Sequence, residues 1–137
     1  MSAKYRVGVI ASGRIAREHG RGWAECEHTE IVAIGDAHPD ALASYADDFG
    51  VPNQYLDYRE MLDKEELDAV YLCIPPTVHS DEVTIIADKG IPLFVEKPQT
   101  LDIKQAIQFN AEIEKSGIIS QVGFVYRYEA SSEPARE

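Results

Sequence analysis

The chain has 137 residues, a length typical of one domain with its own hydrophobic core and too short for a two-domain enzyme. Hydrophobic residues make up 45% and charged residues 27% of the chain, which excludes a disordered, collagenous or membrane-embedded class. With 24 acidic and 13 basic residues the net charge is -11, which repels nucleic acid and anionic membranes. We therefore expect a globular domain that holds an anionic ligand only through local groups.

The amino terminus runs from Met1 into an apolar segment without a basic region, a long apolar region or a cleavage site, so we expect no export. The apolar runs are far shorter than the roughly 18 residues that cross a bilayer. Cys26 lies in a polar stretch and Cys73 in an apolar one, which predicts neither a disulfide scaffold nor a zinc site. These features predict a cytoplasmic protein without a metal centre.

Short apolar runs alternate with longer amphipathic ones, a pattern typical of a doubly wound α/β fold with a parallel sheet covered on both faces. Runs rich in β-branched or aromatic residues predict strands at 5–10, 31–34, 69–74, 93–95 and 118–123, with a further short strand near 54–56. The intervening stretches predict helices at 13–26, 39–49, 58–62, 78–89 and 101–116.

Residues at the ends of these helices support the assignment. Pro39 suits a first helical position, and Asp57 with Glu60 forms a capping-box pattern. Left-handed residues are expected just after three helices, at Gly50, Gly90 and Gly117. In the last helix one apolar stripe should face the sheet, formed by Ile103, Ala106, Ile107 and Ile113.

The turn after the first strand reads Ala11-Ser12-Gly13-Arg14-Ile15-Ala16, where a dinucleotide-binding fold places a glycine-rich motif. Backbone N–H groups at the start of the following helix would point at a pyrophosphate, and Gly13 would permit its close approach. Ala11 stands where the first glycine is usual. It strains the turn if the position needs a positive φ and is tolerated if φ is negative.

Asp36 follows the second predicted strand, 23 residues after Gly13. An acid at this place can accept hydrogen bonds from ribose hydroxyls and repel a 2′-phosphate, which favours NAD over NADP. The alternative is that Asp36 caps the helix that begins at Pro39. We favour the ribose contact because of its position at the end of a strand.

Two further turns, Ile74-Pro75-Pro76-Thr77-Val78-His79 and Val95-Glu96-Lys97-Pro98, lie at the carboxyl ends of predicted strands, where open α/β sheets bind ligands. Together with the glycine turn and Asp36, this ordered set resembles the glucose-fructose oxidoreductase, inositol dehydrogenase and rhizopine-catabolism (Gfo/Idh/MocA) family. The resemblance covers nearly the whole chain.

The resemblance implies an NAD-binding Rossmann domain with strand order 3-2-1-4-5-6. It places Asp36 at the adenosine ribose, Lys97 at the reacting group as the catalytic residue, and a cis peptide bond before Pro98. The remaining implied cofactor contacts are Ser12, Gly13, Arg14, Ile15, Ile74, Pro75, Pro76, His79 and Glu96.

Lys97 has a chemical reason to matter, because an ammonium beside a reacting C–O bond can stabilise alkoxide charge or relay a proton. From spacing alone, a surface lysine paired with Glu96 is the alternative. His79 is either a cofactor contact or a packed or capping side chain. We expect no functional role for the other histidines, His19, His28 and His38.

By resemblance, residues 1–127 form the NAD-binding domain of an oxidoreductase that acts on a CH–OH group of a sugar, polyol or related metabolite. Residues 128–137, with a helix-opening pattern from Ser131, would lead to a second domain that this chain lacks and that supplies substrate contacts and an oligomer interface. We therefore expect the chain alone to be inactive and to form a homo-oligomer. The alternative is a non-catalytic NAD-binding regulator or sensor.

Overall fold

The computed structural model describes residues 4–128; the predicted helix opening from Ser131 lies outside the described residues. Six parallel strands form one sheet in the order β3-β2-β1-β4-β5-β6, which confirms the predicted Rossmann topology. The strands are β1 (Tyr5–Ile10), β2 (Thr29–Gly35), β3 (Asn53–Tyr55), β4 (Ala69–Leu72), β5 (Leu93–Val95) and β6 (Ser120–Val122).

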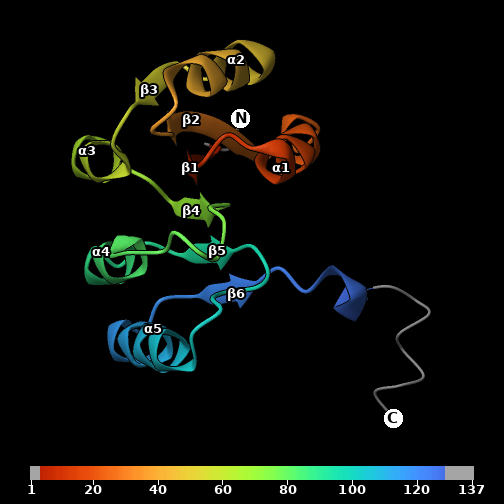
Figure 1. Ribbon diagram of the computed structural model, residues 1–137. Helices are drawn as coiled ribbons and strands as arrows, with labels where there is room; N and C mark the ends of the chain where they lie inside the picture. The colour runs from red at the N-terminus through yellow and green to blue at the C-terminus, as the bar shows by residue number, and fades with distance from the viewer. Residues whose placement is uncertain (1–3, 129–137) are drawn as a thin grey trace.

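Helices cover both faces of this sheet (Figure 1). They are α1 (Arg14–Ala24), α2 (Pro39–Phe49), α3 (Tyr58–Lys64), α4 (Glu82–Asp88) and α5 (Ile103–Ser116), followed by a short 3-10 helix at Val125–Tyr128. Successive residues of β1 point to opposite faces: Val9 belongs to the core under α1 and α2, and Ile10 to the core under α3, α4 and α5. Two apolar cores therefore hold the strand ends in fixed relative positions.

Most of the predicted helix ends are confirmed. Pro39 is the first residue of α2, and the Asp57 side chain accepts a hydrogen bond from the backbone N–H of Arg59. Glu60 does not complete the capping box, because its carboxylate pairs with Lys64 one turn later. Backbone φ angles of 65°, 70° and 70° confirm the left-handed residues, Gly50, Gly90 and Gly117.

Two elements around the Pro-Pro turn are shorter than predicted. Strand β4 ends at Leu72 rather than at residue 74, and α4 begins at Glu82 rather than at residue 78. Pro75 and Pro76 have no backbone N–H with which to extend the ladder, and the N–H of Ser80 donates to the Glu82 side chain rather than to a carbonyl of a preceding helical turn. The segment between these elements is consequently a loop at the carboxyl ends of the strands.

The predicted apolar stripe of α5 is wrong in part. Ile103 and Ile107 are 73% and 64% exposed, whereas Phe109, which the stripe omits, is 1% exposed. Ile113 does pack against the core. Positions 107 and 109 point roughly 200° apart on a helix, so burial of the larger Phe109 ring turns Ile107 toward solvent.

Candidate nucleotide-binding site

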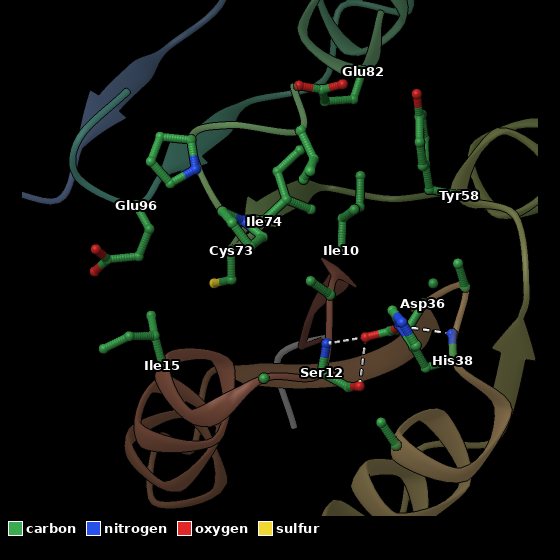
Figure 2. Close-up of a pocket in the computed structure, with 18 of the residues that line it drawn as sticks. Ile10, Ser12, Ile15, Asp36, His38, Tyr58, Cys73, Ile74, Glu82 and Glu96 are labelled. Atoms are coloured by element: carbon green, nitrogen blue, oxygen red, sulfur yellow. Dashed lines mark hydrogen bonds and ion pairs between the residues drawn. The ribbon is translucent and has the colours of Figure 1, made fainter. Parts of the chain in front are cut away.

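A cavity of about 840 Å³ lies at the carboxyl ends of the strands (Figure 2). Its walls come from the segments that follow β1, β2, β4 and β5 and from the start of α3. Nearly all of the predicted cofactor contacts line this cavity: Ser12, Gly13, Arg14, Ile15, Asp36, Ile74, Pro75, Pro76, Glu96 and Lys97. The fold therefore brings together residues up to 85 positions apart in the sequence.

The glycine turn leaves space for a ligand beside the start of α1. Gly13 is the residue preceding the helix, and a Cβ placed on it would meet nothing within 4 Å. The first backbone N–H groups of α1 have no partner within the helix, so they can bind an anion there. Ala11 has a φ of 74°, so this turn does require a left-handed residue and the alanine is strained.

Asp36 is held by neighbouring donors. The backbone N–H and the hydroxyl of Ser12 both donate to Oδ2, at 2.8 and 2.6 Å. The backbone N–H of His38 donates to Oδ1 at 2.8 Å, and its ring Nδ1 lies 3.0 Å from the same oxygen. Burial alone would raise the pKa of Asp36, but the hydrogen bonds from Ser12 and His38 outweigh it and lower the pKa.

The alternative role predicted for Asp36, a cap of α2, is not observed. His38 is the residue that precedes α2, and its own backbone N–H is the one that binds Asp36, rather than an N–H of the first helical turn. Asp36 instead ties the end of β2 to the glycine turn through Ser12. The carboxylate is thus fixed at the cavity wall, as Figure 2 shows.

At the opposite end of the cavity, Glu96 and Lys97 follow β5, and the Lys97–Pro98 peptide bond is cis. Glu96 is 8% exposed, and its Oε1 lies 3.0 Å from Nε2 of His19 on α1. Among the described residues Lys97 forms no ion pair with Glu96, which was its alternative role. The Lys97 side chain is exposed on the cavity wall.

His79 is not on the cavity wall. Its side chain is 1% exposed, its Nδ1 bonds Glu82, and its ring lies edge-on to Phe109 of α5. Glu82 does line the cavity although it is fully buried. Burial would raise the pKa of Glu82, but hydrogen bonds from His79 and from the backbone of Ser80 lower it. His79 therefore orients a wall residue, and a direct cofactor contact by His79 stays a prediction.

Several cavity residues were missed by the sequence analysis. His38 was assigned no role, and Tyr58, at the first position of α3, was considered only as part of a helix. The Tyr58 hydroxyl donates to Asp81, and burial together with this bond raises the pKa of Tyr58 to about 12. Arg59 Nε also binds Asp81, at 3.1 Å. The positions of His38 and Tyr58, three residues after the ends of β2 and β3, were the signal in the sequence that could have placed them at the cavity.

The arrangement suits an extended ligand with several recognisable parts. A carboxylate that can bind a ribose diol stands at one end, open helix N–H groups that can bind phosphate lie between, and an ammonium group stands at the other end.

Over residues 4–128, no cluster of three or more His, Cys, Asp or Glu could hold a metal ion. No helix in the same range is both long and apolar enough to span a membrane.

Comparison with known proteins gives consistent matches. The sequence model of an oxidoreductase family with an NAD-binding Rossmann fold matches residues 5–124. An uncharacterized oxidoreductase, YrbE, of Bacillus subtilis is 30% identical over 94% of this chain and 38% of its own length. The scyllo-inositol 2-dehydrogenase (NAD(+)) of the same organism is 27% identical over 99% of this chain and 40% of its own length.

A crystal structure of scyllo-inositol dehydrogenase from Lactobacillus casei, with bound NAD(H) and scyllo-inositol, has the same fold. The TM-score is 0.89 at 24% identity, over 97% of this chain and 40% of that one. The chain thus spans about 40% of the length of these relatives.

Proposed function

The chain belongs to the Gfo/Idh/MocA oxidoreductase family and has its NAD-binding Rossmann fold. We therefore propose that it is the NAD-binding part of a dehydrogenase that acts on a CH–OH group of a sugar, polyol or related metabolite. The observation that carries this proposal is the cavity that runs from Asp36, past the start of α1, to Lys97. The inositol dehydrogenases among the relatives support the substrate class.

The residues of the cavity fit a dinucleotide. The open space beside Gly13 admits a pyrophosphate next to the N–H groups of α1. Asp36, positioned by the backbone N–H groups of Ser12 and His38, would accept hydrogen bonds from the ribose hydroxyls in place of the Ser12 hydroxyl and the His38 ring, because both of its oxygens already have two neighbours. Its negative charge would repel a 2′-phosphate, so NAD is the expected cofactor rather than NADP.

Lys97 would act at the reacting carbon. Bound NAD supplies the hydride acceptor of the reaction. The Lys97 ammonium, free of Glu96 and facing the cavity, would stabilise negative charge on the substrate oxygen or relay its proton. No other residue of this chain is assigned to the chemical step.

Substrate positioning would come from a second domain, with residues 1–127 as the nucleotide-binding part. Positioning of a reactant contributes on the order of 7 to 11 kcal/mol to lowering a barrier, so the chain alone should bind NAD and turn over no substrate. Following NADH absorbance with a panel of sugars and polyols tests this. Saturable NAD reduction that Lys97→Ala abolishes would contradict it.

Cofactor preference tests the binding proposal separately. In calorimetric titrations NAD should bind more tightly than NADP, and Asp36→Ser should narrow the difference. Asp63→Ser, on the exposed side of α3 where Asp63 pairs with Lys89, is a matched control and should leave the preference unchanged. Equal affinities of the unmodified chain for the two cofactors would refute the role of Asp36.

A further inference from the structure

The contact between His19 and Glu96 joins two parts of the cavity that are 77 positions apart in sequence. His19 lies on α1, the helix that begins at the glycine turn, and Glu96 lies just after β5. An ionised carboxylate only accepts hydrogen bonds, so Nε2 of His19 must be the donor over the 3.0 Å separation. The pair therefore fixes one carboxylate oxygen of Glu96 from the middle of α1.

The His19 ring is itself held in place by three aromatic rings. Trp23 stacks on it with ring centres 5.8 Å apart, Phe94 meets it edge-on at 5.4 Å, and Tyr71 is tilted against it at 5.5 Å. Such packing limits the ring to one orientation. Its Nε2 donor is thus directed at Glu96 before a ligand arrives.

The second oxygen of Glu96 remains available to a ligand. Among the described residues, no donor is bonded to Oε2. Figure 2 shows the Glu96 carboxyl group beside Cys73 and toward Ile15, at the end of the cavity away from Asp36. A Cβ on Gly123 would lie 3.1 Å from Oε1, so the backbone just after β6 also lies close to the carboxylate.

We propose that Glu96, positioned by His19, accepts a hydrogen bond from the carboxamide NH₂ of nicotinamide and rejects a ring that carries a carboxylate in its place. This rests on the proposed function: with the adenosine ribose at Asp36 and the pyrophosphate at the start of α1, the nicotinamide end of the dinucleotide would reach the cavity wall formed by Glu96 and Lys97. A carboxamide offers the donor that a buried carboxylate needs. A nicotinic acid ring would instead place two negative charges together in a partly buried site.

Three ligands separate this inference from the proposed function. NAD carries the carboxamide, nicotinic acid adenine dinucleotide carries a carboxylate, and ADP-ribose lacks the ring. We expect the chain to bind NAD at least about tenfold more tightly than the nicotinic acid analogue, the ratio typical of one hydrogen bond to a charged group. ADP-ribose should bind because its contacts lie at Asp36 and the glycine turn.

Glu96→Gln should reduce the ratio of the two dinucleotide affinities to about threefold or less, because its amide can also donate to the carboxylate. ADP-ribose affinity should stay within about twofold. Glu112→Gln, on α5 where Glu112 binds Thr84, is the matched control and should leave the ratio at its original value. An unchanged ratio in Glu96→Gln would overturn the inference.

His19→Leu keeps an apolar side chain among the aromatic rings but removes the donor, so the affinity ratio should fall while ADP-ribose affinity holds. His19→Gln restores a donor near the position of Nε2 and should recover most of the ratio. A purely structural role of His19 would lower all three affinities together. If His19→Leu fails to fold, His19→Gln and Glu96→Gln still decide the question.

The outcomes distinguish the two proposals. Binding of ADP-ribose with equal affinities for NAD and its nicotinic acid analogue would overturn the role of Glu96 alone. Failure of ADP-ribose to bind would overturn the proposed nucleotide site, and the role of Glu96 with it.

Discussion

Ala11 is the one residue other than glycine with a positive φ in the described part of the chain, at 74°. An L-residue in this left-handed region is destabilised by roughly 1 to 2 kcal/mol. A glycine there would relieve this strain but add flexibility to the unfolded chain, which lowers stability by about 0.4 to 1 kcal/mol. The net effect of Ala11→Gly is thus a gain of roughly 0.5 to 1 kcal/mol in the free energy of unfolding.

Urea denaturation at pH 7 measures this gain directly, and the thermal midpoint should rise by about 2 to 4 °C. NAD affinity should not fall, because the backbone N–H of residue 11 can keep its 2.8 Å hydrogen bond to Gly35. The matched control is Ala43→Gly, the same change at an exposed position of α2, which should destabilise by about 1 kcal/mol. Equal destabilisation by both substitutions would refute the assignment of strain to Ala11.

Three further predictions follow from burial and charge. Gly20→Ala should destabilise the protein by about 1 to 3 kcal/mol, since the added Cβ would lie 2.8 Å from two side chains of α2. Gly22→Ala, with open space around the added Cβ, should instead stabilise α1 by about 1 kcal/mol, and denaturant titration of both variants measures the two effects. Phe109→Ala should destabilise by about 3 to 5 kcal/mol and Ile107→Ala by less than about 0.5 kcal/mol; similar losses would contradict the observed orientation of α5. The lowered pKa of Asp36 makes its ionised form stabilising above about pH 4, so the stability advantage over Asp36→Asn should be full at pH 7 and should shrink as pH falls through the folded-state pKa; an advantage that grows as the pH is lowered below about 4 would contradict this.

Much of the fold was predictable because its signals are local. The bounds of β1, α2 and β5 agree with the sequence prediction. For α2 the signals are Pro39 at its first position and the left-handed Gly50 just after it, and β5 is followed by the charged Glu96. The left-handed glycines, such as Gly50, were predictable because few other residues tolerate that conformation. The strand order came instead from the family resemblance. Parallel strands are joined through long crossover connections, so local sequence signals do not show which strands are neighbours in the sheet.

The orientation of α5 was not predictable from periodicity alone. Ile103 and Ile107 form a regular apolar stripe, but the helix turns a different face, that of Phe109, to the sheet. Which face is buried depends on the shape of the surface under the helix, which the helix sequence does not contain. The same limitation applies to Ala11, because its φ of 74° belongs to the path of the turn between β1 and α1, which the residue type does not reveal.

The candidate site was predictable as a set of turns but not as a network. Asp36 and Lys97 are recognisable from their places after strands, whereas the roles of His19 and Glu82 depend on partners brought near them by folding. Sequence alone offered His79 as the cavity residue, and the structure places Glu82 there with His79 behind it. His79 lies in the loop before α4 and Glu82 is the first residue of that helix, so the path of this loop decided between the two.

The central claim is that the cavity at the carboxyl ends of the strands is the NAD site. Backbone amide chemical shifts of the ¹⁵N-labelled chain, recorded while NAD is added, test it most directly. The account predicts the largest changes at residues 11–15, 36–38, 73–78 and 96–97, with little change along the exposed face of α5. Changes centred elsewhere, such as on the small hollow formed by residues 52–56 with Glu60 and Lys64, would contradict it.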